Sequence, residues 1–94
     1  MDRDELIQAA GFGHAAILKA LLDKGADVNV RDAYGWTALM YAAHKGHADV
    51  VKILIDRGAD VNARDSEQTS ALKCAKRKGF IDLVRLLEAA GAVD

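Results

Sequence analysis

Helix breakers and cysteine are scarce in this sequence. Proline is absent, so glycine is the only residue type left to interrupt a helix. The one cysteine, Cys74, excludes an intramolecular disulfide and fits a reducing, cytoplasmic location inside the cell. No apolar run approaches the ~20 residues that span a bilayer, and Met1-Asp2-Arg3 does not begin a signal peptide. We therefore expect an intracellular globular chain whose eight glycines mark the element boundaries.

An excess of charge of either sign is also missing. The 13 Lys and Arg residues nearly balance the 14 Asp and Glu residues, which leaves a formal net charge of −1. A protein that binds nucleic acid or a membrane surface needs a basic excess to displace counterions. Hydrophobic residues make up 51% and charged residues 29% of the chain, a composition typical of a folded domain. We therefore expect neither nucleic acid nor a membrane as the partner.

What the sequence does contain is a repeat with a period of 33 residues. The segment Gly25-Ala26-Asp27-Val28-Asn29 recurs intact as Gly58-Ala59-Asp60-Val61-Asn62. Further columns with the same spacing are Gly13, Gly46 and Gly79; Leu6, Leu39 and Leu72; Ala9, Ala42 and Ala75; Ile17, Val50 and Leu83; and Leu21, Leu54 and Leu87. We therefore divide the chain, as a single domain, into repeats at about residues 1–30, 31–63 and 64–94.

Each repeat is predicted to contain two helices. In the middle repeat Leu39, Ala42 and Ala43 lie at positions i, i+3 and i+4, the spacing of one helix face. Thr37 precedes this helix as a predicted N-cap, and Ser70 takes the same place in the third repeat. The polar segments between repeats predict extended loops or hairpins, with a turn near Asp65-Ser66. The predicted first helices cover residues 4–11, 38–45 and 70–78, and the second helices cover 14–24, 48–57 and 80–89.

The period and the run from Gly46-His47 to Asn62 resemble the ankyrin repeat. The family hallmark T-P-L-H-x-A is altered here to Thr37-Ala38-Leu39-Met40, although the resemblance covers essentially the whole chain. It implies an all-α solenoid of three stacked helix-loop-helix units joined by hairpin loops. It also implies a positive φ angle at Gly35, where the third repeat has Gln68 at a cost of about 1 kcal/mol.

The two end repeats carry polar replacements typical of caps. In the first repeat Asp4-Glu5 stands where the middle repeat has Thr37-Ala38, and Asp2 with Glu5 predicts a capping box. In the third repeat three positions change from apolar to charged: Lys73 replaces Met40, Lys76 replaces Ala43 and Glu88 replaces Ile55. We therefore interpret the chain as a capped, monomeric module.

Two residue groups suggest chemistry but are better explained by the repeat. His44, His47 and Asp49 could suggest a metal site, yet His47 belongs to the same column as His14 and no cluster completes a coordination sphere. Cys74 could suggest a thiol nucleophile, but no base is assigned to it. Phosphate-binding and nucleophile-elbow motifs are absent. We therefore expect no enzymatic activity, no metal and no cofactor.

The resemblance implies that hairpin tips and first helices form a concave face that binds another protein. Three of the five aromatic residues belong to it, and such side chains often anchor interfaces. Two alternatives remain open: Trp36 packs on the neighbouring hairpin, or the chain is a passive scaffold or stability model without an evolved partner. The basic cluster from Lys73 to Lys78 is either a solvated cap or a surface for an acidic partner. The predicted binding residues are Phe12, Ala33, Tyr34, Trp36, His44, Lys45, Ser66, Glu67, Thr69, Arg77 and Lys78.

Overall fold

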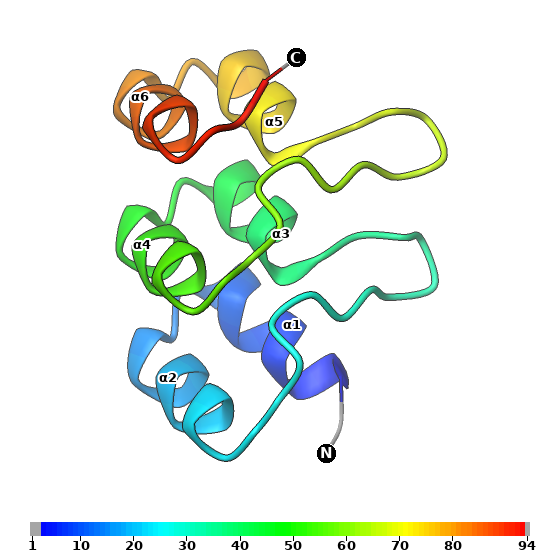
Figure 1. Cartoon of the computed structure of the whole chain (residues 1–94), viewed down its shortest axis with the longest axis vertical. Coiled ribbons are helices and arrows are strands. Elements are labelled where there is room, and N and C mark those ends of the chain that lie inside the picture. The colour runs from blue at the N-terminus through cyan, green and yellow to red at the C-terminus, as the bar shows by residue number, and fades with distance from the viewer. Residues whose placement is uncertain (1–2, 94) are drawn as a thin grey trace.

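The computed structural model describes residues 3–93, and there the chain forms three stacked helix pairs. Figure 1 shows the pairs following one another along the longest axis, with hairpin loops projecting to one side before α3 and α5. One isolated antiparallel bridge closes each hairpin. The six helices of the described residues are α1 (Arg3–Phe12), α2 (Ala15–Asp23), α3 (Ala38–Lys45), α4 (Ala48–Asp56), α5 (Ala71–Lys78) and α6 (Ile81–Ala89).

The predicted all-α solenoid is confirmed, and no predicted helix end is displaced by more than one residue. The predicted N-caps are confirmed too. The Thr37 side chain accepts a hydrogen bond from the Met40 backbone N–H at 3.3 Å, and Ser70 accepts one from Lys73 at 3.2 Å. Both caps satisfy a backbone donor that the first helical turn leaves without a partner. The capping box predicted for Asp2 and Glu5 lies partly outside the described residues.

The core lies between successive repeats. Helices α1, α3 and α5 pack against one another in one layer, and α2, α4 and α6 form the second layer. The three aligned leucines of the first layer, Leu6, Leu39 and Leu72, are all buried. In the second layer Leu54 and Leu87 are completely buried. The 33-residue columns therefore mark the positions through which each repeat contacts its neighbours.

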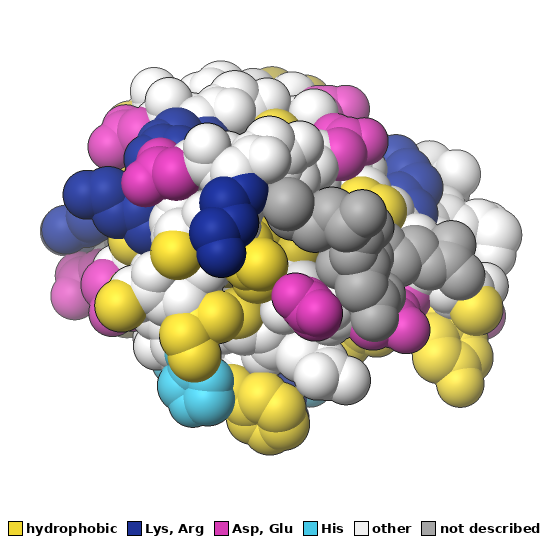
Figure 2. All heavy atoms as spheres, turned by 90° about the horizontal axis from the view of Figure 1, so that it is seen from below, with side chains coloured by type: hydrophobic (Ala, Val, Ile, Leu, Met, Phe, Trp, Pro, Cys, Tyr) yellow, Lys and Arg dark blue, Asp and Glu magenta, His cyan; other side chains and the backbone are white. Residues whose placement is uncertain are grey.

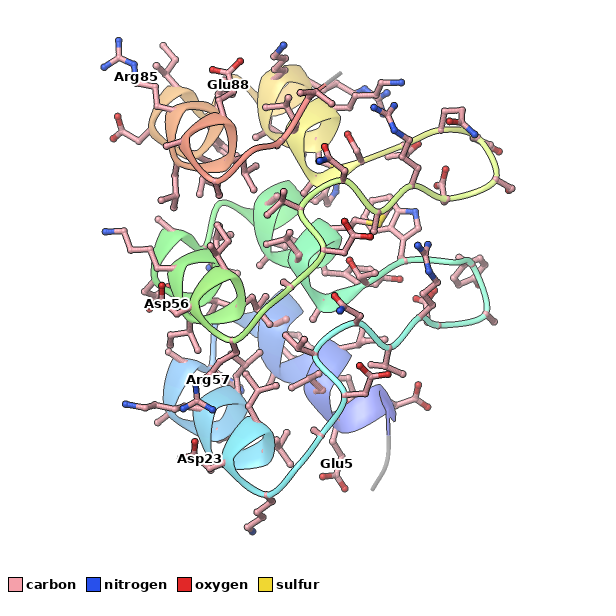
Figure 3. All side chains as sticks on the ribbon, viewed as in Figure 1. Glu5, Asp23, Asp56, Arg57, Arg85 and Glu88 are labelled. Carbon is pink, nitrogen blue, oxygen red and sulfur yellow. The ribbon has the colours of Figure 1, made fainter. Side chains whose placement is uncertain are left out.

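The C-terminal end is capped as predicted, whereas the N-terminal end keeps an apolar position uncovered. Met40 is buried in the middle repeat, and Lys73, which replaces it, reaches solvent in part. Glu88 is exposed on the outer side of α6 (Figure 3). At the other end Ile17 is 54% exposed, although Val50, one repeat later, is fully buried. Figure 2, seen from the N-terminal end, shows hydrophobic side chains on this face. The prediction of polar capping at both ends is therefore wrong at the Ile17 position. Ile17 is exposed because no repeat precedes it in the described structure.

Polar side chains in the loops tie each repeat to the next. The side-chain oxygen of Asn29 accepts a hydrogen bond from the Asp60 backbone N–H at 2.7 Å, and Asn62 accepts one from Val93 at 2.8 Å. The Arg57 guanidinium also pairs with the Asp23 carboxylate at 2.6 Å, linking two neighbouring second helices (Figure 3). The two asparagine contacts recur with the 33-residue period and hold successive inter-repeat loops together, whereas the Arg57–Asp23 pair has no counterpart in the next repeat, where Ala90 replaces Arg57.

Gln68 adopts the left-handed conformation predicted for it, with φ at 66°. We expect Gln68→Gly to increase the free energy of unfolding by about 1 kcal/mol, because glycine avoids the steric cost of this backbone region. Chemical denaturation measures the gain, and amide exchange should slow in α5 and α6. The same two helices should exchange faster than α3 and α4 in the unmodified chain. Gly35→Ala, at the equivalent position with φ at 78°, is the reverse control and should destabilise. An unchanged unfolding midpoint for Gln68→Gly would contradict the argument.

Candidate functional site

A groove of about 780 Å³ lies between the two hairpins and the helices that follow them. Its walls come from the hairpin tips, from the C-terminal part of α3 and from α5. The groove brings together nine of the eleven predicted binding residues: Ala33, Tyr34, Trp36, His44, Lys45, Ser66, Glu67, Thr69 and Arg77, and Tyr41 and Asp65 complete the lining. Lys78 lies outside the lining, and Phe12 lines a separate hollow described below.

Each hairpin is held in shape by an aspartate at its base. Asp32 accepts hydrogen bonds from the backbone N–H groups of Tyr34 at 2.9 Å and Trp36 at 3.0 Å. One repeat later, Asp65 accepts them from Glu67 at 2.8 Å and Thr69 at 2.9 Å. Such aspartate-centred turns are local, so each segment encodes its own hairpin. The Thr69 N–H, helped by Trp36 and Glu67, lowers the pKa of Asp65 because these donors stabilise the carboxylate.

Trp36 joins the two hairpins while keeping part of its ring accessible. Its indole N–H donates to the Asp65 side chain at 2.9 Å, and the ring packs on Tyr41 with centroids 4.9 Å apart. His44 meets the indole edge-on at 5.9 Å. Trp36 is thus half-buried and braces the neighbouring hairpin, as the alternative interpretation expected, and it also forms part of the groove wall. Tyr34 differs, because 79% of it is exposed at the hairpin tip.

Tyr41 was missed as a groove residue by the sequence reasoning. Its hydroxyl donates a hydrogen bond to Asp32, and burial together with this carboxylate raises the pKa of Tyr41 to about 12. The phenol therefore stays protonated and holds Asp32 at physiological pH. One feature of the sequence could have indicated the special position of Tyr41. The equivalent residues in the other repeats are Gln8 and Cys74, so the side-chain chemistry at this position differs in every repeat.

The helical wall of the groove is basic. Lys45 at the end of α3 and Arg77 at the end of α5 belong to this wall, Lys78 follows Arg77 outside the lining, and all three side chains are exposed. Within residues 3–93 the structure gives none of these three side chains a hydrogen bond or an ion pair. Partial burial lowers the pKa of His44, and the positive charges of Lys78, Lys45 and Arg77 lower it further. The pKa of His44 therefore reports the positive electrostatic potential at this wall.

This potential leads to a titration experiment. We expect Lys78→Gln to raise the pKa of His44 toward its ordinary value of 6.5, because one of the repelling cations is removed. An NMR titration of the His44 ring protons measures the shift, and Lys52→Gln on α4 is a control that should leave it unchanged. Because the folded pKa of His44 is depressed, its contribution to stability is present above pH 6.5 and is lost as the pH falls through the folded value. A pKa of His44 that does not respond to Lys78→Gln would contradict the electrostatic explanation.

A second hollow of about 500 Å³ adjoins the groove on the side of the first repeat. The two hollows share Tyr41 and Lys45. Phe12 borders the second hollow and is 69% exposed. Its remaining lining consists of Ile7, Gln8, Gly11 and His47. The His47 ring contacts the Gly11 carbonyl oxygen at 3.0 Å, so this hollow forms only when the first two repeats stack.

The residues considered for catalysis or metal binding do not converge. Among residues 3–93 no group of three or more His, Cys, Asp or Glu side chains is placed to hold a metal ion. His44 packs on Trp36, whereas His47 contacts the first repeat. Cys74 is buried, and this burial raises the pKa of its thiol, which disfavours the thiolate. No helix in the described part of the chain is both long and apolar enough to cross a membrane.

Comparison with known proteins adds two findings. Residues 6–93 match the family model for ankyrin repeats, in three copies. A stretch of 33 residues, or 35% of the chain, is 61% identical to the protein named Probable E3 ubiquitin-protein ligase XBOS33 from Oryza sativa subsp. japonica. This stretch corresponds to 6% of that protein, so the chain covers only a small part of its relative.

Proposed function

Because this chain belongs to the ankyrin-repeat family, whose members generally mediate protein–protein interaction, we propose that it binds a partner protein through its concave face. We define the concave face as the groove between the hairpins together with the adjoining hollow at Phe12. On this proposal the chain acts as a monomer and without catalysis. The face extends over three repeats, so an interface of at most about 800 Å² per partner is expected.

The observation that carries this proposal is an exposed aromatic side chain on a braced support. Tyr34 has 79% of its surface exposed, and the backbone beside it is held by Asp32. Asp32 is itself held by Tyr41, and Trp36 connects the hairpin to the next one. A pre-organised site loses little conformational entropy on binding, and tyrosine is favoured as an interface anchor. The alternative of a passive scaffold requires only that these residues support the fold.

Affinity capture with matched variants distinguishes the two functions. We expect the unmodified chain to retain a cellular protein whose binding weakens at least tenfold for Tyr34→Ala, because the anchor is lost. Quantitative mass spectrometry of the captured proteins, followed by titration calorimetry with the purified partner, measures the loss. Trp36→Ala should weaken binding as well, and its unfolding must be followed in parallel because it also loses the bond to Asp65.

The control is Ile81→Ala, which shortens a side chain that is 64% exposed on α6, outside the concave face. It should bind like the unmodified chain. If no captured protein depends on Tyr34 or Trp36, binding through the concave face is rejected in favour of the passive scaffold.

A further inference from the structure

We infer that the ligand of the concave face is an extended peptide segment that combines carboxylate side chains with an apolar side chain a few residues away. This inference rests on the proposed function and adds the chemistry of the partner. Two independent observations support it. Cations at or next to the helical wall of one hollow have no hydrogen bond or ion pair within residues 3–93, and the adjoining hollow has a mainly apolar lining.

The cations can attract a partner of opposite charge. Lys45, Arg77 and Lys78 are exposed near one another at the C-terminal ends of α3 and α5, with no hydrogen bond or ion pair within residues 3–93. All three also act on His44, so they project positive charge into the same region. Carboxylates brought to this wall would gain attraction from several cations at once, and such complementarity raises association rates and specificity.

The acidic side chains of the groove do not cancel this attraction fully. Asp32 and Asp65 each accept hydrogen bonds from two backbone N–H groups and at least one further side chain. Both carboxylates therefore already have hydrogen-bond partners within the protein. Of the two aspartates only Asp65 lines the groove, and Glu67 at the hairpin tip, which is exposed, is the other acidic group of the lining. The groove thus has an acidic tip and a basic helical wall, and the ligand carboxylates belong at the wall.

The adjoining hollow takes an apolar side chain. Ile7 forms part of its lining, and the exposed ring of Phe12 stands at its border. An apolar group placed there would cover the Phe12 ring and gain free energy in proportion to the area removed from water. Tyr41 and Lys45 belong to both hollows, so one ligand can occupy both without a gap.

The spacing of the two hollows favours an extended chain. They lie over successive first helices, α1 with α3 and α3 with α5. Packed helices lie about 8–10 Å apart, and an extended chain advances about 3.3 Å per residue. The apolar side chain and the first carboxylate of the ligand are therefore about three residues apart.

The test uses a displayed library of random 12-residue peptides selected on the immobilised unmodified chain. We expect the enriched peptides to share an apolar residue about three positions from Asp or Glu. A fluorescent synthetic peptide with the enriched sequence is then titrated against two triple variants. The first, Lys45→Gln with Arg77→Gln and Lys78→Gln, should bind at least tenfold more weakly, and Phe12→Ala should also weaken binding.

The second triple variant controls for net charge. It combines Lys19→Gln, Lys52→Gln and Arg85→Gln, three exposed cations of one column on α2, α4 and α6. Arg85 projects from α6 on the side opposite the hairpins (Figure 3). This variant loses the same charge and should change the affinity less than twofold. Affinity of the unmodified chain should fall with added salt more steeply than that of the first triple variant.

The outcomes separate the inference from the proposed function. Enriched peptides without acidic residues, or equal affinities for the two triple variants, would overturn the inference. If those peptides still depended on Tyr34, the proposed protein-binding function would stand. If the enriched peptides bound Tyr34→Ala, Phe12→Ala and both triple variants as well as the unmodified chain, both the inference and the concave face would be rejected.

Discussion

Leu54→Ala is expected to lower the free energy of unfolding by about 2–5 kcal/mol. Leu54 is completely buried in the helical layer formed by α2, α4 and α6. Shortening it removes apolar contacts and leaves a cavity between repeats, because the neighbouring helices can collapse only in part. A chain of 94 residues has a total stability of about 5–14 kcal/mol. The substitution therefore removes a large share of it, which urea denaturation monitored by circular dichroism will measure.

Leu21→Ala provides the matched control. Leu21 occupies the same column as Leu54 in the first repeat, but it is only partly buried because no repeat precedes it in the described structure. The same three carbon atoms are removed, so a difference between the two variants reports burial rather than side-chain type. We expect Leu21→Ala to cost less than half as much as Leu54→Ala. Equal losses would contradict the inference that stacking between repeats supplies the stability.

Gly13→Ala is expected to destabilise the chain by about 1.5–3.5 kcal/mol. Gly13 has φ at 74°, where a side chain costs about 1–2 kcal/mol. A Cβ atom there would lie 2.8 Å from Nδ1 of His47, which is too close for a real contact. The His47 ring would have to move and weaken its contact with the Gly11 carbonyl, a hydrogen bond that contributes about 0.5–1.5 kcal/mol. Thermal unfolding and denaturant titration measure the sum.

Gly79→Ala separates the cost of backbone strain from the cost of steric contact with a neighbouring repeat. Gly79 has the same φ of 74°, yet nothing lies within 4 Å of a Cβ atom added to it, since the described residues place no further repeat against it. Its substitution should cost only the backbone strain of about 1–2 kcal/mol. Gly46→Ala should cost more than Gly79→Ala but less than Gly13→Ala, since its added Cβ would lie 3.1 Å from the Phe80 ring, which has no hydrogen bond to lose. Identical losses at Gly13 and Gly79 would show that contact across repeats contributes nothing.

The binding face could be predicted only as a set of positions. Tyr34 and Glu67 fall at hairpin tips because Asp32 and Asp65 form local turns, and that much follows from the sequence. The participation of Tyr41 could not be predicted, because its position depends on Trp36 stacking over it from the hairpin. The role of these residues in partner binding stays a prediction for the capture and library experiments.

The sequence by itself determined what depends on neighbours along the chain. Helix ends follow from Thr37 and Ser70, whose side chains bond to a backbone group three residues ahead. The positive φ of Gln68 follows from its place in the Gly35 column. The period then specified that such units stack, because a single helix pair cannot bury its apolar face.

Only the tertiary structure decided what depends on contacts between repeats. The Trp36–Asp65 bond joins residues 29 positions apart, and its geometry is set by the distance between two hairpins. The exposure of Ile17 beside the burial of Val50 has no local cause either, since both occupy one column of the repeat. The same holds for the depressed pKa of His44, which burial lowers most and which Lys78 and Arg77 of the next repeat lower further, together with Lys45 of its own helix. Sequence spacing encodes local geometry, whereas packing, exposure and electrostatic potential arise only when the repeats are stacked.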